Sequence, residues 1–429
     1  MAVIWLSCVL APALVQRVGP APALVQRVGR LASGGSQSPL AQCPNPGCGA
    51  LLKPARVTAH LRRCPAVLEQ RELEASGYYF RDVNTGEALP GECGPLVLGD
   101  ASAAELAALT AQVHSGHAAC FGSRLAHTPP IPADTPRTTW TGSKHELARE
   151  RHRVQRRAIV DELAALGALG RGHCIIELGA GNGELSLAMA ETHPAMVRTD
   201  TIILLDQRGK PRGRQGHNRH AADAALRTRC ASFTRVKVGL QHVDLAALRD
   251  KHAPGRRIVV LAKHLCGAAS DYALRAVAAA SREPQPPVAL VLGTCCHQHI
   301  SRRAYPNRAY LEGALGLSAR QFQLLCRLSS HGVSEGGVRE GGVREGGVRE
   351  GGVRQSANDT HLKRPAEGGS RAAARADTGR RAKDLLDEGR AAFLRTQGFD
   401  ARLCTYVDAS VTPENVLIVA QEGRSTVSA

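Results

Sequence analysis

Aromatic residues are scarce in this sequence, and it offers little that could cross a membrane. Phe, Trp and Tyr make up 3% of the 429 residues. The amino-terminal MAVIWLSCVLAPALV is apolar, but it lacks a preceding basic segment and is shorter than a membrane span. No other stretch is long and uncharged enough to cross a bilayer. We therefore expect neither a signal peptide nor a transmembrane helix.

The thirteen cysteines lack the regular spacing of a disulfide framework. Their odd number and wide scatter favour reduced thiols and a metal site over the disulfides of a small secreted protein. We therefore expect an intracellular protein. The sequence leaves nucleus and cytoplasm equally open.

Acidic residues are outnumbered by basic ones. Lys and Arg total 55 against 38 Asp and Glu, which gives a formal net charge of +17. Such an excess favours a polyanionic partner, because Lys and Arg side chains neutralise phosphates and release counterions. Nucleic acid is the leading partner class. The alternative is a solvated basic surface on a chain that is biased toward Ala, Gly and Arg.

Apolar segments with strand character alternate with helix-like segments over the second half of the chain. This rhythm predicts an α/β domain with a mainly parallel, doubly wound sheet. Before it, residues 143–167 carry apolar residues at helical spacing and a densely basic opposite face, which predicts a helix. The expected strands are CIIEL (174–178), TIILLD (201–206), VGLQHVDL (238–245), IVVLAKHL (258–265), VALVLGT (288–294) and ENVLIVA (414–420).

The remaining segments divide the chain into six parts. The string APALVQRVG occurs twice near the amino terminus, too short a unit to be a structural repeat, and indicates disorder or an artefact of gene prediction. GYYFRDVNTGE (77–87) gathers three aromatics that either pack on a neighbouring module or stack on unpaired bases, and packing is the default. The predicted parts are a disordered terminus (1–42), a zinc finger (43–66), a linker (67–142), a core (143–333), a flexible REGGV-containing insertion (334–380) and the rest of the core (381–422).

A glycine-rich turn follows the first expected strand. Glu177 precedes the loop, and Gly179, Gly181 and Gly183 let the backbone approach a ligand closely before a helix begins near Glu184. The G-x-G-x-G spacing differs from the G-x-G-x-x-G of dinucleotide sites, and Glu177 would repel a pyrophosphate. The loop therefore favours S-adenosylmethionine, which has no phosphates, over NAD.

Two acidic residues follow the next expected strands. Asp206 ends a strand about one βαβ unit downstream, where a carboxylate accepts hydrogen bonds from ribose hydroxyls. Asp244 ends the third expected strand, near the predicted adenine pocket. Either side chain could instead be a solvated acid at a strand end.

Four metal-ligating residues are grouped ahead of the core. Cys43, Cys48, His60 and Cys64 have spacings that can close a tetrahedral zinc site, with His60 and Cys64 one helical turn apart. Such a site lets about twenty residues fold with almost no core. The neighbouring arginines indicate contact with phosphate around a structural zinc ion.

Two later motifs carry a family resemblance. AKHLCGAASDYALR (262–275) and GTCCHQHISRRAY (293–305) resemble motifs of the tRNA 2′-O-methyltransferases that modify nucleotide 4 of the acceptor stem. RAYLEGALGLSARQF with RLSS, and the terminal QGF with VTPENVLIVA, are similar to the same family. The resemblance covers most of residues 143–330 and 381–420, and it implies a class I (Rossmann-like) S-adenosylmethionine-dependent methyltransferase domain with tRNA as partner.

The zinc-finger segment departs from the family in two ways. It resembles the family's Cys-His-His-Cys finger, but Cys48 stands where the family has His, and Cys is an equally good zinc ligand. The family carries a further Cys-rich finger ahead of this one, whereas residues 1–42 offer only Cys8.

The resemblance places the chemistry at two strand ends. Methylation of a ribose 2′-hydroxyl needs in-line attack on the sulfonium methyl and loss of the hydroxyl proton. Lys263 is expected to orient the hydroxyl or lower its pKa, and His264 to accept the proton. Cys295, Cys296 and His297 are expected to line the facing strand end, with Cys296 and His297 in the catalytic set.

Other roles for these motifs stay open. KHLCG and TCCH could shape the pocket and bind phosphate without proton transfer. A zinc site made of Cys295, Cys296, His297 and His299 is less favoured, because four nearly adjacent ligands would strain a tetrahedron. The alternatives for the whole chain are a methyltransferase for another RNA, such as ribosomal RNA, and a non-catalytic zinc-finger RNA-binding protein.

Overall fold

The computed structural model describes residues 40–45, 48–89, 96–122, 143–207, 214–336 and 369–423. The repeated APALVQRVG segment and the REGGV repeats lie outside these residues, so the expectations for them stay predictions. The chain divides into two units, 1–68 and 69–429, and each is described by itself. Among the described residues, no helix has the length and apolar character needed to span a membrane.

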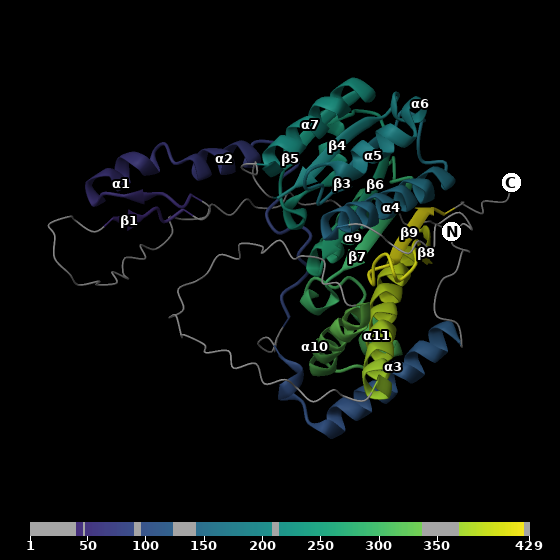
Figure 1. Ribbon diagram of the computed structural model, residues 1–429. Helices are drawn as coiled ribbons and strands as arrows, with labels where there is room; N and C mark the ends of the chain where they lie inside the picture. The colour runs from purple at the N-terminus through teal and green to yellow at the C-terminus, as the bar shows by residue number, and fades with distance from the viewer. Residues whose placement is uncertain are drawn as a thin grey trace, which may run out of the picture. The chain divides into compact units, whose positions relative to one another are not determined.

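The larger unit is built on a seven-stranded sheet within the described part of the chain, with the order β5-β4-β3-β6-β7-β9-β8 (Figure 1). Neighbours from β5 through β7 are parallel, whereas β9 is antiparallel to both β7 and β8. The predicted doubly wound α/β fold of the class I methyltransferase type is confirmed. The strands are β3 (Cys174–Leu178), β4 (Thr201–Asp206), β5 (Ser232–Lys237), β6 (Ile258–Cys266), β7 (Ala289–Cys295), β8 (Phe399–Thr405) and β9 (Val416–Glu422).

Helices cover both faces of the sheet, which explains why its central strands are apolar throughout. Every residue of β3, β4 and β7 is buried, as expected for parallel strands between two helical layers. One apolar core joins the sheet to α4 (Lys144–Ala165), α5 (Glu184–Thr192), α6 (Pro194–Val197) and α7 (Arg214–Arg229). A second core joins the other face to α8 (Leu245–His252), α9 (Ala268–Ala280) and the end of α11 (Gly369–Thr396).

The helix expected over residues 143–167 is present as α4. Ser143 caps its first turn: the Ser143 side chain accepts a hydrogen bond from the Glu146 amide, and the Glu146 carboxylate accepts one from the Ser143 amide. This reciprocal capping satisfies two backbone donors that a helix start leaves without partners. The apolar stripe of α4, including Ile159 and Leu163, is fully buried against the sheet.

A third apolar cluster corrects two predicted boundaries. Helix α3 (Ala103–Phe121) lies within the segment expected to be a linker, yet Leu109 and Val113 are buried against α10 (Ala319–Leu328) and α11 (Figure 1). Helix α11 already begins at Gly369, so residues 369–380 do not belong to a flexible insertion. Helix α3 is Ala-rich and α11 is rich in Ala and Arg, and packing on distant partners stabilises both helices where local sequence gives little signal. Short turns complete this region: η1 (Leu98–Asp100), η4 (Ala309–Ala314) and η5 (Ser329–Gly336).

One predicted strand is wrong. VGLQHVDL forms the short turn η2 (Leu240–His242) and the start of α8, and the strand is the preceding SFTRVK of β5. Because β5 is an edge strand with polar residues, it lacks the apolar run that marks the buried strands. The aromatic segment packs beside this turn: Tyr78 and Tyr79 contact the core, as expected, while Phe80 is 49% exposed.

Candidate active site and metal module

The glycine loop joins β3 to α5 in a conformation that requires glycine. Gly179, Gly181 and Gly183 have φ angles of 63°, 49° and 83°. A Cβ atom at Gly179 would lie 2.8 Å from the Leu265 side chain, and one at Gly183 would lie 2.6 Å from the Leu204 side chain. The loop is therefore pressed against the ends of β4 and β6, where the backbone can also approach a ligand. The KHLCG motif of β6 lies directly beside it.

Glu177 braces the start of α5. Its carboxylate is 4% exposed and accepts hydrogen bonds from the Ser186 amide at 2.9 Å and the Ser186 hydroxyl at 2.5 Å. Burial raises the pKa of Glu177 to about 7, against the opposing effect of these hydrogen bonds. The residue predicted to contact the cofactor thus lies under the loop and holds helix and strand together.

The two predicted aspartates differ in their surroundings. Asp206 lies at the end of β4, as expected, and its Oδ2 accepts a 2.7 Å hydrogen bond from the Gly181 amide. Asp244 is not at a strand end: it caps α8, and its Oδ1 accepts hydrogen bonds from the amides of Ala246 and Ala247. The contact of Asp206 with ribose and the contact of Asp244 with adenine both stay predictions.

Arg235 on β5 forms hydrogen bonds with the glycine loop, and this role was not apparent from the sequence. Its guanidinium donates hydrogen bonds to the carbonyl oxygens of Gly181 at 2.8 Å and Asn182 at 3.2 Å. The same group pairs with Asp223 of α7 at 2.6 Å, and both side chains are 11% exposed. No motif marks either residue, because β5 and α7 meet the loop only in the folded sheet.

Lys263 and His264 lie where β6 departs from regular pairing. The register with β7 shifts between Ala262 and Leu265, so these two residues occupy an irregularity of the kind that re-aims side chains near active sites. Lys263 Nζ lies 2.6 Å from Nδ1 of His152 on α4. His152 was not predicted, and it links the basic helix to the predicted catalytic lysine.

The TCCH turn at the end of β7 brings together residues from both motifs. Cys295 pairs with Cys266 in the parallel register, and their Sγ atoms are 3.2 Å apart. Cys296 has a φ of 51°, a strained value for a residue with a side chain. Hydrogen bonds with Cys266 and Cys295 lower the pKa of the Cys296 thiol, while hydrogen bonds with Cys266 and Cys296 raise that of Cys295.

His297 points into a buried charge network. It is 2% exposed, and its Nε2 lies 2.9 Å from the Asp387 carboxylate of α11. Burial opposes ionisation of Asp387, but His297, Arg390 and Thr294 outweigh it, so the pKa of Asp387 lies below its ordinary value. Arg390 is fully buried and also pairs with Asp271 of α9 at 2.8 Å. The network fixes the TCCH turn against two helices.

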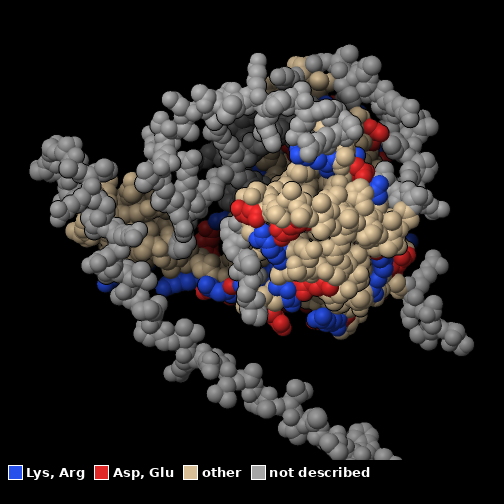
Figure 2. Space-filling model, turned by 90° about the horizontal axis from the view of Figure 1, so that it is seen from below, with Lys and Arg blue, Asp and Glu red and all other residues tan. Residues whose placement is uncertain are grey.

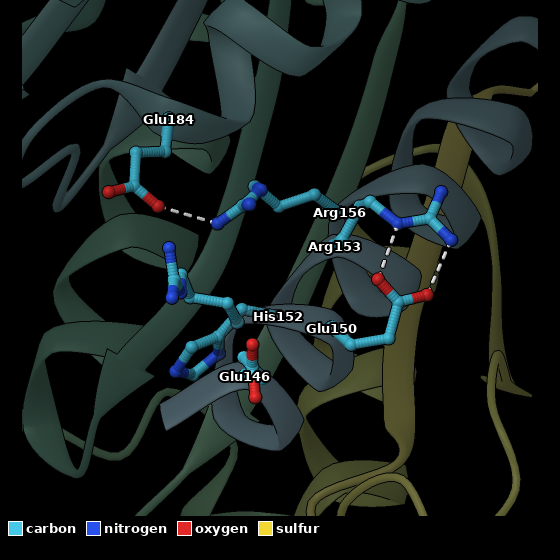
Figure 3. Close-up of a pocket in the computed structure, with 7 residues that line it drawn as sticks. Glu146, Glu150, His152, Arg153, Arg156 and Glu184 are labelled. Atoms are coloured by element: carbon cyan, nitrogen blue, oxygen red, sulfur yellow. Dashed lines mark hydrogen bonds and ion pairs between the residues drawn. The ribbon is translucent and has the colours of Figure 1, made fainter. Parts of the chain in front are cut away.

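A pocket of about 670 Å³ opens between α4 and the start of α5. Figure 3 shows Arg156 reaching Glu184, with Nη1 donating to the carboxylate at 2.5 Å. Arg153 forms a fork with Glu150, in which Nε donates to the carboxylate at 2.7 Å. Because Glu184 directly follows the glycine loop, the pocket adjoins the predicted cofactor site. Its lining residues are Glu146, Arg149, Glu150, His152, Arg153, Arg156 and Glu184.

Basic side chains are distributed unevenly over the described surface. In the view of Figure 2, Lys and Arg side chains are interspersed with Asp and Glu around a broad uncharged area. By contrast, α4 carries arginines at positions 149, 153 and 156, which share one side of a helix and line the pocket. Arginines of α4 therefore line the pocket that adjoins the predicted cofactor site.

The first unit contains the predicted metal module. A hairpin of β1 (Ala41–Gln42) and β2 (Leu51–Leu52) precedes α1 (Pro54–Leu61), and α2 (Pro65–Glu74) follows. The four predicted donor atoms lie within 4.8 Å of one another. The Sγ atoms of Cys43 and Cys64 are 3.8 Å apart, which matches the ~3.8 Å edge of a tetrahedron with Zn–S bonds of about 2.3 Å. Cys48 Sγ lies 3.3 Å from His60 Nε2. The donor set and its geometry fit zinc.

Comparison with known proteins gives consistent relatives. The mouse protein "tRNA:m(4)X modification enzyme TRM13 homolog" is 26% identical over 329 residues, which are 63% of this chain and 64% of that protein. The Schizosaccharomyces pombe protein "tRNA:m(4)X modification enzyme TRM13" is 23% identical, and the match covers 85% of this chain and 91% of that protein. The chain spans a little under two thirds of the mouse and Yarrowia lipolytica relatives.

Among solved structures, the plantazolicin methyltransferase BpumL in complex with SAH covers 75% of this chain and 97% of its own, with 8% identity and a TM-score of 0.29. The decisive match is to a family profile. The profile described as Methyltransferase TRM13 matches residues 154–421, well over half of the chain, and includes the glycine loop and both later motifs. This chain belongs to the TRM13 methyltransferase family.

Proposed function

We propose that this protein is an S-adenosylmethionine-dependent tRNA methyltransferase that methylates the ribose 2′-hydroxyl of nucleotide 4 in the acceptor stem. The observation that carries the proposal is the meeting of three features in a TRM13-family chain. The glycine loop, Asp206 and the irregular end of β6 with Lys263 adjoin at the carboxyl ends of the strands. Ligands of open α/β sheets bind at this edge.

The cofactor would lie over the glycine loop. When bound, S-adenosylmethionine supplies an electrophilic methyl group. The loop backbone offers close approach, and Asp206, which accepts a hydrogen bond from the Gly181 amide, ends β4 where a carboxylate suits a ribose hydroxyl. Arg235 keeps the loop in place through hydrogen bonds to its carbonyl oxygens. The absence of a pyrophosphate in this cofactor agrees with a buried carboxylate, Glu177, beneath the loop.

Proton transfer is assigned to the end of β6. Lys263 would hold the 2′-hydroxyl oxygen and favour its ionisation, and His264 would accept the proton. His152 lies 2.6 Å from Lys263 Nζ and acts as a positioning residue, since it fixes where the ammonium group points. His297 is buried on Asp387, which supports a positioning role for it rather than direct contact with substrate.

The tRNA would approach along α4. Its arginines line a pocket that adjoins the glycine loop, and A-form stems are recognised mainly through phosphates and 2′-hydroxyls. Arg149→Ala should weaken tRNA binding and reduce the salt slope by about one phosphate contact. Arg157→Ala is the matched control, because Arg157 is on the same helix but pairs with Asp161 and does not line the pocket. Equal losses in both variants would refute this placement.

Labelled S-adenosylmethionine and total RNA test the function. We expect label in tRNA, and nucleoside analysis should place it on the ribose of nucleotide 4. Lys263→Ala and His264→Ala should bind cofactor normally and transfer methyl groups at least about 100-fold more slowly. Lys251→Ala is the control, because Lys251 lies on α8 and donates to the Ser76 carbonyl.

The outcomes separate the alternatives. Label in ribosomal or other RNA, with none in tRNA, would support the second enzyme class. Absence of label from a folded protein that binds RNA would support a non-catalytic RNA-binding protein. Wild-type rates in both Lys263→Ala and His264→Ala would overturn the assignment of those residues while leaving the substrate class intact.

A further inference from the structure

Three cysteines converge at the ends of β6 and β7, apart from the four-residue metal module. The Sγ atoms of Cys266, Cys295 and Cys296 all lie within 4.8 Å of one another. Cys266 and Cys295 are opposite each other in the parallel register, which puts their side chains on the same face of the sheet. Cys266 is exposed, Cys295 is buried and Cys296 is half-buried, so the cluster opens to solvent on one side.

The backbone is built to hold these sulfurs together. A Cβ atom at Gly293 would lie 2.2 Å from the Lys263 carbonyl oxygen, and one at Gly267 would lie 2.6 Å from the His299 carbonyl oxygen. The Gly267 amide also donates to the Cys295 carbonyl at 3.0 Å. Only glycine at these two positions allows β6 and the TCCH turn to approach so closely.

The strained backbone at Cys296 brings the third sulfur into the cluster. Its φ of 51° is one of two positive values among the described residues that are not glycine. Such a conformation costs on the order of 1–3 kcal/mol and persists where the surroundings require it. A disulfide between Cys266 and Cys295 would involve only two sulfurs and would not account for the strained backbone at Cys296. A metal ion would use all three.

We propose that Cys266, Cys295 and Cys296 bind a zinc ion through their three thiolates, as a second metal site of this chain. Three soft sulfur ligands from two strand ends select zinc over hard cations such as magnesium. Among the described residues the cluster supplies three donors, so a water molecule or another ligand completes the tetrahedron. The ion ties the KHLCG and TCCH motifs to each other.

The site differs from the one considered from sequence. That hypothesis joined Cys295 and Cys296 to His297 and His299 and was disfavoured because adjacent ligands strain a tetrahedron. In the structure Nε2 of His297 bonds to Asp387, and Cys266 takes its place from a neighbouring strand. Because Cys266 comes from a second strand and only two of the three donors are adjacent in the chain, a tetrahedral site can form without that strain.

Metal analysis of the full chain, purified under reducing conditions without chelators, tests the site independently of methyl transfer. We expect about two zinc ions per chain, one for each site. Cys266→Ser with Cys295→Ser should lose one ion and retain the other, and Cys43→Ser with Cys64→Ser should do the same at the other site. Cys230→Ser is the matched control and should keep both, because its thiol donates to backbone carbonyls outside the cluster.

Cobalt substitution in the Cys43→Ser and Cys64→Ser background gives a second readout. Thiolate-to-cobalt charge transfer should appear, and it should weaken in the single Cys266→Ser variant, in which only an exposed side chain changes. One zinc ion in the wild-type chain, unchanged by cluster substitutions, would overturn the proposal. So would a Cys266–Cys295 disulfide found by mass analysis of the chain as purified under reducing conditions, because those two sulfurs would then be unable to bind zinc as thiolates.

Discussion

Replacing Arg235 should have two measurable effects, a lower free energy of unfolding and weaker binding of the cofactor by the glycine loop. Arg235 and Asp223 form a pair whose side chains are each 11% exposed, and the guanidinium also binds two loop carbonyls. Breaking a buried pair by truncating one partner costs about 3–5 kcal/mol, because the other charge stays buried. We therefore expect Arg235→Ala to lower the free energy of unfolding by about 4 kcal/mol. Urea unfolding measures this change.

The same variant should bind S-adenosylmethionine more weakly. Hydrogen bonds from a charged donor contribute about 1.5–3 kcal/mol each, and loss of two of them releases the carbonyls of Gly181 and Asn182. If half the free energy of one such bond, about 0.75–1.5 kcal/mol, is lost from cofactor binding, the Kd for cofactor rises about three- to tenfold, since 1.4 kcal/mol is a factor of ten. Calorimetry at a temperature where the variant is folded gives this value.

A double variant distinguishes the effect of Arg235 on the loop from the effect of its buried pair with Asp223. Arg235→Met with Asp223→Leu removes both charges of the pair together, so neither partner is left buried without the other and most of the lost stability should return. Cofactor affinity should stay low, because the loop carbonyls still lack their donor. Arg229→Ala is the control: its pair with Glu191 is exposed, and stability should change by less than about 0.5 kcal/mol. Wild-type cofactor affinity in the double variant would refute the positioning role of Arg235.

Three further predictions concern the core and the metal module. Because the folded-state pKa of Glu177 is raised to about 7, this carboxyl favours the fold below pH ~4.5, and its contribution is lost as pH rises through 7. Glu177→Gln should therefore gain stability over wild type at pH 8 relative to pH 5, by up to about 3 kcal/mol in urea unfolding; an equal difference at both values contradicts it. Gly293→Ala should lower the melting temperature by several degrees through its clash with a backbone oxygen, whereas Gly313→Ala, which meets nothing within 4 Å, should not. A strong chelator should unfold the Cys43-to-Cys64 module, as seen by loss of amide protection there, and persistence of that protection would contradict a structural zinc ion.

Much of the fold could be predicted from local sequence. Strands such as TIILLD are continuous apolar runs because both faces of the sheet are covered, and the capping box at Ser143 marks the start of α4. The glycine loop was recognisable because three left-handed positions need glycine. The metal module was recognisable because its four donors are close in sequence and must meet around one ion.

The features that sequence missed depend on partners far along the chain. The edge strand β5 has no continuous apolar run, and α3 and the start of α11 are stabilised by packing on each other rather than by local propensity. His152, 111 residues before Lys263, reaches it only because α4 lies against the sheet. Such contacts leave no periodic pattern.

The sequence by itself determined the alternation of strands and helices, the glycine turn and the four-ligand module, because each depends on residues that are neighbours in the chain. Only the tertiary structure decided which side chains share a site. The parallel register placed Cys266 opposite Cys295, and the sheet order brought Arg235 under the glycine loop. These meetings follow from packing between distant segments, whose pairing no local spacing specifies.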